Sequence, residues 1–353
     1  MLQTPSVSER QTILERVCRG ERGPRVPVWI MRQAGRYLPD YRELRKSADF
    51  LTATRTPELA AQITMLPMRR FRLDAAILFS DIMTPLESMG VPVRFTPGPI
   101  VDVPIRSHRQ VKALRELHAE ERVPFVLETI RLVRSELETH RALIGFAGAP
   151  FTLFCYLVEG RGSKDFMQAR SFLLREPVAA GDLLTLLGQS MSSYLVAQAR
   201  AGADAVMLFD SWIGLLGPAE YRRFILPVLQ RVVSTFRSQA RQPIIYFARG
   251  GAALLEAITN LDVDVVGVDW NLPLSDAVRQ LGPRTVVQGN LDPAYLFAPR
   301  GDLGAAIDRV LESGAGAAGH IFNLGHGIHQ DTDPDQVAFL VDRVHETSER
   351  LGL

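Results

Sequence analysis

The stretch Val-Trp-Ile-Met-Arg-Gln-Ala-Gly-Arg-Tyr-Leu-Pro-Asp-Tyr-Arg, residues 28–42, joins an apolar run to two arginines one helical turn apart. The run over residues 26–31 predicts a strand that is buried on both faces, as strands of parallel sheets are. Arg32 stands where this strand ends, and the spacing directs Arg32 and Arg36 to the same side. Because ligands of α/β proteins bind where parallel strands end, the pair indicates an anion site.

Neutral donors accompany these arginines. Gln33 and Tyr37 each follow one of them, and guanidinium forks match the geometry of carboxylates and phosphates. A surface turn held by ion pairs is the alternative, because Asp40 and Glu43 follow closely. The position directly after a core strand favours the ligand site.

Composition excludes several classes of protein. The chain has 353 residues, and its 40 Lys and Arg residues nearly balance its 39 Asp and Glu residues, so we expect no nucleic-acid or membrane partner. Cys18 and Cys155 stand far apart, which argues against a disulfide framework and a cysteine-rich zinc site. The N-terminal sequence lacks a signal-peptide pattern, and we expect a cytoplasmic protein.

Buried strands alternate with helices along the chain. Apolar runs predict strands over residues 26–31, 75–79, 143–147, 205–209, 244–247, 263–268, 285–288 and 320–322. Helical patterns cover residues 9–18, 58–65, 125–138, 177–201, 218–240, 252–260, 274–281 and 302–313. Eight strands alternating with helices predict an α/β fold, a (β/α)8 TIM-type barrel of parallel strands.

Local signals refine this prediction. Residues 91–105 read as two alternating segments around a Pro- and Gly-rich turn, which predicts a β-hairpin inserted after the second strand. Helix starts are predicted at Thr56-Pro57 and Asp333-Pro334, where a capping residue precedes proline. No linker or repeat interrupts the pattern, so we expect residues 1–353 to form a single catalytic domain.

Polar residues follow several of the predicted strands. Asp81 comes directly after the second strand, where its carboxylate needs a donor or cation as partner; capping of the next turn is an equally good role for it. The other candidates are Tyr156 beyond the third strand, Ser211 after the fourth and His326 after the last. In a barrel, residues at these ends gather at one mouth.

The histidines also raise the possibility of a metal site. His320, His326 and His329 lie close in sequence, but the first strand offers no His-x-His pair, so hydrogen bonding of His326 to an anion is favoured. The run Gly314-Ala-Gly-Ala-Ala-Gly319 matches G-x-G-x-x-G, yet it follows a helix and precedes a strand. That order is the reverse of a dinucleotide site, and we interpret the run as a loop.

Several motifs together resemble one family. They are Pro27-Val-Trp-Ile-Met-Arg-Gln-Ala-Gly-Arg-Tyr-Leu-Pro, Phe79-Ser-Asp-Ile, Gly148-Ala-Pro-Phe-Thr-Leu, Gly267-Val-Asp-Trp, Gln288-Gly-Asn-Leu-Asp-Pro and Ile321-Phe-Asn-Leu-Gly-His-Gly. In this order they resemble the uroporphyrinogen decarboxylase family nearly end to end. The resemblance implies a (β/α)8 barrel, a homodimer, a cytoplasmic location and the removal of four acetate carboxyl groups from uroporphyrinogen III to give coproporphyrinogen III in haem biosynthesis.

The resemblance also implies the site residues and a cofactor-independent carboxy-lyase without metal. Matched motif by motif, the substrate-binding residues are Arg32, Gln33, Arg36, Asp81, Tyr156, Ser211 and His326, with Asp81, Arg32 and Tyr156 as catalytic residues. The protonated pyrrole would be the electron sink, and the Asp81 carboxylate would stabilise the cationic intermediate. Arg32 is a candidate proton donor through a nearby water, although arginine holds its proton tightly.

Departures from the family pattern and two rival functions bear on this interpretation. Arg161, Arg249 and Asn271 stand where glycine, lysine and threonine are usual, so the shape of the pocket is in question. A zinc-dependent methyltransferase of similar fold would need a late cysteine, and the sequence has none after Cys155. A tetrapyrrole carrier without catalysis would not need Asp81.

Overall fold

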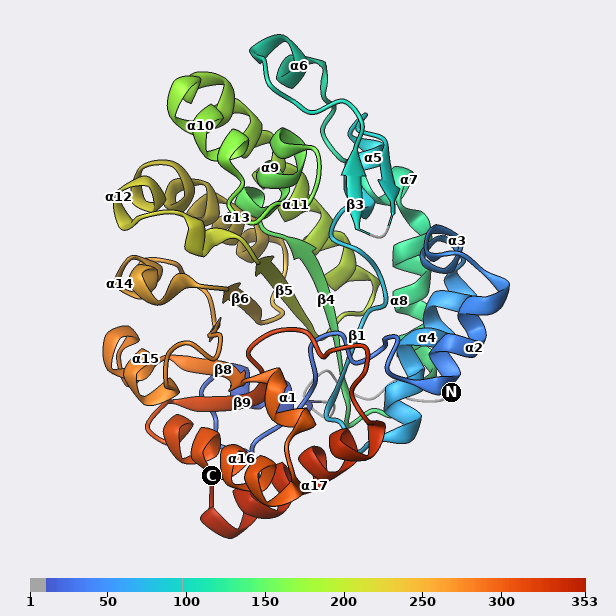
Figure 1. Cartoon of the computed structure of the whole chain (residues 1–353), viewed down its shortest axis with the longest axis vertical. Coiled ribbons are helices and arrows are strands. Elements are labelled where there is room, and N and C mark those ends of the chain that lie inside the picture. Colours follow the sequence, from blue (N-terminus) through green and yellow to red (C-terminus); the bar gives the residue numbers. More distant parts are fainter. Residues whose placement is uncertain (1–10, 97) are drawn as a thin grey trace, which may run out of the picture.

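A curved parallel sheet organises the computed structural model, which describes residues 11–96 and 98–353. Within these residues, seven strands follow one another in the order β1-β4-β5-β6-β7-β8-β9, each parallel to the next (Figure 1). Their bounds are β1 Ala75–Ile77, β4 Ala142–Gly148, β5 Ala205–Asp210, β6 Ile244–Ala248, β7 Val265–Gly267, β8 Val286–Leu291 and β9 Gly319–Leu324. All seven coincide with predicted strands, and the predicted TIM-type α/β fold is confirmed.

The first predicted strand, over residues 26–31, takes a different form. It contributes one isolated parallel bridge, between Val28 and Phe322 of β9. On its other side, the Asp74 N–H donates to the Val28 carbonyl at 2.9 Å. This segment therefore lies between β9 and the start of β1 and completes the ring.

The prediction of a regular strand there is wrong because side chains, and not a neighbouring strand, accept hydrogen bonds from its backbone N–H groups. The Ile30 N–H donates to Gln33 Oε1 at 3.0 Å, and the Met31 N–H donates to Asn323 Oδ1 at 2.9 Å. Pro27 has no N–H to offer. The backbone groups are satisfied without a strand partner, and the chain can turn at once.

Helices cover the outside of the sheet (Figure 1). Their bounds are α1 Ile13–Cys18, α2 Pro39–Ser47, α3 Phe50–Arg55, α4 Pro57–Arg70, α5 Thr84–Ser88, α6 His108–Ala113, α7 Ala119–Arg122, α8 Pro124–Glu136, α9 Pro150–Glu159, α10 Met167–Arg175, α11 Pro177–Ala201, α12 Pro218–Glu220, α13 Leu226–Gln239, α14 Leu255–Ile258, α15 Leu274–Leu281, α16 Arg300–Gly314 and α17 Pro334–Leu351. Short 3₁₀ segments are η2 Ile213–Leu215, η4 Gly251–Leu254 and η5 Pro293–Phe297, and η3 Tyr221–Ile225 is a π-helical turn. Among the described residues, no helix has the length and apolar character needed to cross a membrane.

Most predicted helices are confirmed, with shifted ends. The predicted helix over residues 9–18 begins at Ile13, and residues 9 and 10 lie outside the described residues. The predicted helix over residues 218–240 is interrupted by the π-helical turn η3, and that over residues 252–260 is split into η4 and α14. Both predicted helix starts are correct, and Asp333 caps α17 by accepting the Asp335 N–H at 2.9 Å. The helices that were not predicted are α2, α3, α5, α6, α7, α9 and α10.

The inserted hairpin is confirmed. After β1 and α5, strand β2 (Val93–Phe95) pairs antiparallel with β3 (Pro99–Val101) in a separate two-stranded sheet. The turn between them includes residue 97, which lies outside the described residues. The Val101 N–H donates to the Gly160 carbonyl at 2.7 Å, and this bond ties the hairpin to the end of α9.

Aromatic side chains link three neighbouring strands. Phe146 of β4 packs edge to face on Phe209 of β5, with ring centres 5.5 Å apart. Phe209 packs in the same way on Phe247 of β6, at 6.2 Å. Such pairs add to the free energy gained by burying their apolar area. These contacts hold β4, β5 and β6 together, and candidate site residues follow the ends of these strands.

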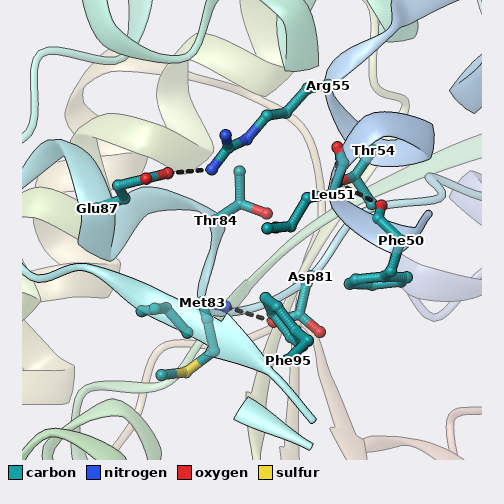
Figure 2. A pocket seen from close by; sticks show the side chains of 10 residues that line it. Phe50, Leu51, Thr54, Arg55, Asp81, Met83, Thr84, Glu87 and Phe95 are labelled. Carbon is teal, nitrogen blue, oxygen red and sulfur yellow. Dashed lines mark hydrogen bonds and ion pairs between the residues drawn. The ribbon is translucent and has the colours of Figure 1, made fainter. Parts of the chain in front are cut away.

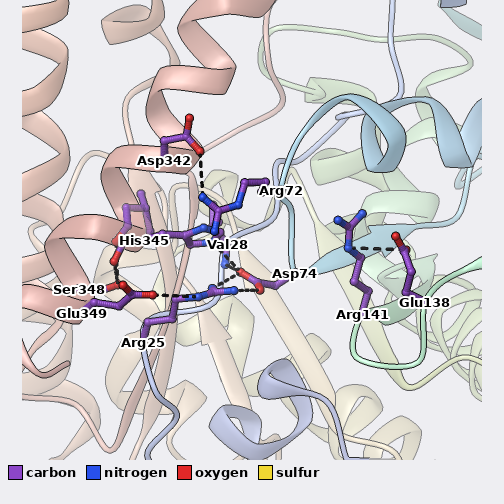
Figure 3. A network of polar contacts seen from close by, with 11 residues as sticks. Arg25, Val28, Arg72, Asp74, Glu138, Arg141, Asp342, His345, Ser348 and Glu349 are labelled. Atoms are coloured by element: carbon purple, nitrogen blue, oxygen red, sulfur yellow. Dashed lines mark hydrogen bonds and ion pairs between the residues drawn. The ribbon is translucent and has the colours of Figure 1, made fainter.

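Asp74 joins the two ends of the ring to the last helix (Figure 3). Its carboxylate accepts two bonds from the Arg25 guanidinium, at 2.7 and 2.8 Å, and one from the Val28 N–H at 2.8 Å. The Nε2 of His345 on α17 lies 3.1 Å from the same carboxylate. Asp74 and His345 are both buried. The segment before β1, β1 itself and α17 are therefore held by one carboxylate.

The pKa of Asp74 reflects these partners. Burial raises it, but the hydrogen bonds from His345 and Arg25 outweigh burial, so the pKa lies below its usual value. A carboxyl group whose pKa is lower in the folded than in the unfolded chain stabilises the fold above the unfolded value of about 4. That stabilisation is lost as the pH falls through the folded pKa.

We therefore expect Asp74→Asn to lower the free energy of unfolding by about 3 kcal/mol at pH 7, because Arg25 is left without its buried partner. The matched control is Asp342→Asn, since Asp342 faces Arg72 at 3.7 Å on the surface, and the expected loss there is below about 1 kcal/mol. Urea unfolding at pH 7 and below pH 4 measures both. Equal losses in the two variants, or a loss for Asp74→Asn that does not shrink in acid, would contradict this account.

Candidate active site

The polar residues predicted from the sequence stand at the carboxyl ends of the strands. Arg32 and Arg36 follow the segment that closes the ring, and Asp81 follows β1. The other positions are Tyr156 on α9 after β4, Ser211 after β5 and His326 after β9. The parallel order of the strands brings these ends to one mouth of the barrel.

A tight turn presents Arg32. Its φ of +65° lies in the left-handed region, which non-glycine residues seldom adopt. The neighbouring Gln33 supports the turn from below: besides accepting the Ile30 N–H, its amide donates to the Ala75 carbonyl of β1 at 3.1 Å. Gln33 is fully buried, whereas Arg32 and Arg36 are exposed. Gln33 thus lies in the core, whereas Arg32 and Arg36 reach the surface after the segment that closes the ring.

Asp81 lies half-buried beside apolar groups. Figure 2 shows its carboxylate near Phe50 of α3 and Phe95 of the hairpin, accepting the Met83 N–H at 2.8 Å. Burial raises the pKa of Asp81, while the Met83 N–H and the charge of Arg32 oppose the increase. The turn-capping role and the functional role considered for Asp81 are therefore compatible, because the same carboxylate caps the turn and interacts with the positive charge of Arg32.

Tyr156 adds a hydroxyl to the same region. Its ring packs edge to face against Phe166 at 5.7 Å and Trp212 at 6.2 Å. Burial raises the pKa of Tyr156, and the charge of Asp81 raises it as well. The phenol therefore stays protonated at neutral pH and can donate a hydrogen bond.

His326 is a neutral imidazole between positive groups. Burial lowers its pKa to about 4, and the charges of Arg32 and Arg249 act in the same direction. The other two histidines point elsewhere, since His320 bonds to the Gly289 carbonyl at 2.9 Å in the core and His329 is exposed. Across residues 11–96 and 98–353, no group of three His, Cys, Asp or Glu side chains is placed to hold a metal ion.

A buried carboxylate supports the loop that carries Ser211. Asp210 accepts bonds from Thr152 Oγ1 of α9 at 2.8 Å and from the Tyr246 hydroxyl of β6 at 2.9 Å. Thr152 Oγ1 in turn accepts the Trp212 N–H at 3.3 Å. Burial raises the pKa of Asp210 to about 6 despite these donors. Asp210 therefore holds the Ser211 loop against the helix that presents Tyr156.

Comparison with known proteins adds a second line of support. A family model described as "Uroporphyrinogen decarboxylase (URO-D)" matches residues 9–347. A protein of that name from Geobacter metallireducens is 44% identical over 333 residues, which cover 94% of this chain and 98% of the relative. Another from Syntrophotalea carbinolica is 46% identical over 332 residues, or 94% of this chain and 96% of the relative.

The chain belongs to the uroporphyrinogen decarboxylase family. The resemblance noted from its motifs is thereby confirmed. Among solved structures, a methyltransferase from Methanosarcina mazei superposes with a TM-score of 0.80 at 20% identity, covering 94% of this chain and 96% of that one. At this identity the likeness shows a shared fold and nothing about activity.

The residues that hold Arg32 in place were not identified from the sequence. Asn323 on β9 accepts the Met31 N–H just before Arg32, and the Ile328 N–H donates to the Met31 carbonyl at 3.0 Å. Gly327 packs directly on the Arg32 side chain: a Cβ there would lie 2.9 Å from its Cγ and Nε. The motif around His326 contained this glycine, but its contact with Arg32 is visible only in the fold.

We expect Gly327→Ala to lower kcat/KM for uroporphyrinogen at least about tenfold, because the new methyl group displaces the Arg32 side chain from a position that matters for binding. The melting temperature should change little, since the arginine can move. Gly316→Ala is the matched control, because a Cβ there meets no atom within 4 Å. If the two variants have equal kcat/KM, the packing of Arg32 on Gly327 has no functional role.

Proposed function

We propose that the chain removes the four acetate carboxyl groups of uroporphyrinogen III as CO₂ to give coproporphyrinogen III. Family membership over residues 9–347 supports a carboxy-lyase of tetrapyrrole biosynthesis. The main observation that supports a reaction at this mouth is the half-buried carboxylate of Asp81, whose pKa is affected by the charge of Arg32.

The site chemistry suits this substrate. Uroporphyrinogen carries eight carboxylates around four pyrrole N–H groups, so its site needs cations and donors at the rim and one acceptor at the centre. Arg32 and Arg36 supply exposed guanidiniums, and the protonated Tyr156 and neutral His326 supply uncharged polar groups. Ser211 adds a half-buried hydroxyl. Gln33 acts from beneath, by holding the Arg32 turn.

Asp81 takes the central role. Its carboxylate accepts the inward pyrrole N–H groups, which brings donors to an anion whose burial is otherwise unfavourable. Protonation of the ring carbon next to the one that bears the acetate then makes the ring cationic, with the positive charge shared by the acetate-bearing carbon, and the fixed anion stabilises that charge. The C–C bond to the carboxylate breaks, CO₂ leaves, and the electron pair flows into the ring.

A second proton completes the reaction. It is added to the exocyclic carbon and leaves a methyl group, while the first proton is released from the ring carbon. We assign Tyr156 to orienting the acetate through its hydroxyl, and Arg32 to binding the carboxylate and the water that carries the proton. The ring serves as the electron sink, so the proposal needs no cofactor and no metal.

The proposal extends to the setting of the enzyme. We propose a cytoplasmic homodimer in which residues 1–353 act as one catalytic domain, with uroporphyrinogen as the partner molecule and no nucleic acid or membrane. The nearly balanced charge of the chain supports the absence of a nucleic-acid partner.

Anaerobic incubation of the chelator-treated protein with uroporphyrinogen III tests the proposed function. Oxidation of the products to porphyrins allows their carboxylates to be counted by chromatography. Successive appearance of products with seven, six, five and four carboxylates is expected. Tight binding without CO₂ release would instead indicate a carrier.

The role of Asp81 has its own test. We expect Asp81→Asn to lower kcat by about 10²- to 10³-fold while substrate still binds, because the amide can accept hydrogen bonds but carries no charge to stabilise the cation. Asp102→Asn, which changes an exposed carboxylate bonded to Arg94 on the hairpin segment, is the control and should keep full activity. Full turnover by Asp81→Asn would refute the central-carboxylate mechanism.

A further inference from the structure

Arg249 stands at the same mouth as Arg32 and has no role so far. It follows β6 directly and is half-buried. Its guanidinium carbon lies 5.7 Å from the centre of a Trp212 ring, above the aromatic face. Within the described residues, 11–96 and 98–353, the Arg249 side chain forms no ion pair and no hydrogen bond.

The backbone of Arg249 is fixed on three sides. Its N–H donates to the Asp210 carbonyl at 3.2 Å, and its carbonyl accepts the Gly214 N–H at 3.1 Å. The next N–H, that of Gly250, donates to a carboxylate oxygen of Asp269. The Arg249 side chain is therefore attached to a rigid turn, which reduces the conformational entropy lost on binding a ligand.

The two acids that bond to the backbone of this turn have carboxylates that bond to groups other than the Arg249 guanidinium. The Asp210 carboxylate is bonded to Thr152 and Tyr246, and the Asp269 carboxylate is bonded to the Gly250 and Asn271 N–H groups. Neither is within ion-pair distance of Arg249 in the described chain. The positive charge thus lacks a counter-ion of the protein's own.

His326 connects this charge with Arg32. Arg249 and His326 follow strands β6 and β9, which end at the same mouth as Arg32, and the Arg32 side chain packs on Gly327, the residue after His326. The charges of both arginines also disfavour protonation of His326. Two guanidiniums beside a half-buried, neutral imidazole repel each other unless an anion lies between them. Arg32 also has no ion pair with the residues described here.

We propose that Arg249, His326 and Arg32 form a subsite for one peripheral carboxylate of the tetrapyrrole substrate. This inference rests on the proposed function and deepens it by assigning Arg249 as a further substrate-binding residue. The carboxylate accepts a two-pronged bond from Arg249 and lies against the imidazole, opposite the contact to Arg32. Trp212 helps to hold the guanidinium over its ring through a cation–π contact.

Arginine suits this position better than lysine does. A guanidinium presents a planar fork of donors and stacks on an indole, whereas an ammonium group is a point charge on a flexible stem. Arg249→Lys should therefore retain the attraction but lose the fixed geometry. Arg249→Gln should lose both.

Binding of uroporphyrin III, the oxidised octacarboxylate, to the full-length protein provides the first measurement, followed by porphyrin fluorescence. We expect Arg249→Gln to weaken binding at least about tenfold, and Arg249→Lys to have an intermediate effect. Arg309→Gln is the matched control: its guanidinium lies 5.8 Å from the Tyr295 ring on the outer helix α16, and its affinity should equal that of the wild type.

A second measurement reports on the subsite itself. Proton NMR titration of His326, assigned with His326→Gln, should show a higher imidazole pKa in Arg249→Gln than in the wild type, because one positive neighbour is removed. Addition of uroporphyrin III to the wild type should also raise that pKa. A purely structural role for Arg249 is compatible with the first change, so the second change is the one that tests carboxylate binding at this site.

The outcomes separate the two proposals. Turnover by the wild type with equal affinity in Arg249→Gln and Arg309→Gln overturns the subsite and leaves the decarboxylase standing. Binding without turnover in the wild type overturns the proposed function, and the affinity of Arg249→Gln then still decides the subsite. Failure of the wild type both to bind the octacarboxylate and to release CO₂ from uroporphyrinogen overturns both.

Discussion

Two side-chain amides take backbone N–H groups that would otherwise continue a β-ladder. Gln33 accepts the N–H of Ile30, and Asn323 accepts that of Met31. With both donors satisfied, the chain leaves the sheet after a single bridge and turns through a left-handed conformation at Arg32. The guanidinium thereby enters the mouth, where the fields felt by Asp81 and His326 depend on it.

Arg32 and Arg249 at the mouth form no ion pair with residues 11–96 and 98–353, so their positive charge is unbalanced within this part of the chain. The buried acids at the strand ends, Asp210 and Asp269, turn to hydroxyl and backbone donors and so serve as supports. Burial and the arginines keep His326 uncharged. An anionic substrate thus supplies the negative charge that the arginines of the site need. Selectivity for a polyanion follows from the lack of carboxylate partners for these arginines as much as from the arginines themselves.

Much of this architecture could be predicted because strands buried on both faces leave continuous apolar runs in the sequence. The segment over residues 26–31 has the same run, but its hydrogen-bond partners include Asn323, far away in sequence, and no local pattern shows that. Helices α2 and α9 were missed although Pro39 and Pro150 mark their first turns. The candidate site residues were found from their positions after strands. The burial of Gln33 and the isolation of Arg249 required the folded geometry, because both depend on which side chains surround them.

The carboxylate of Asp74 has a consequence for how the protein is made. It binds Arg25 near the start of the chain and His345 near its end, so this junction cannot form until the ribosome has delivered α17. The ring itself closes once β9 is present, because the segment over residues 26–31 then lies between β9 and the start of β1. The Asp74 junction is therefore complete only when segments more than 300 residues apart in the sequence have both been made.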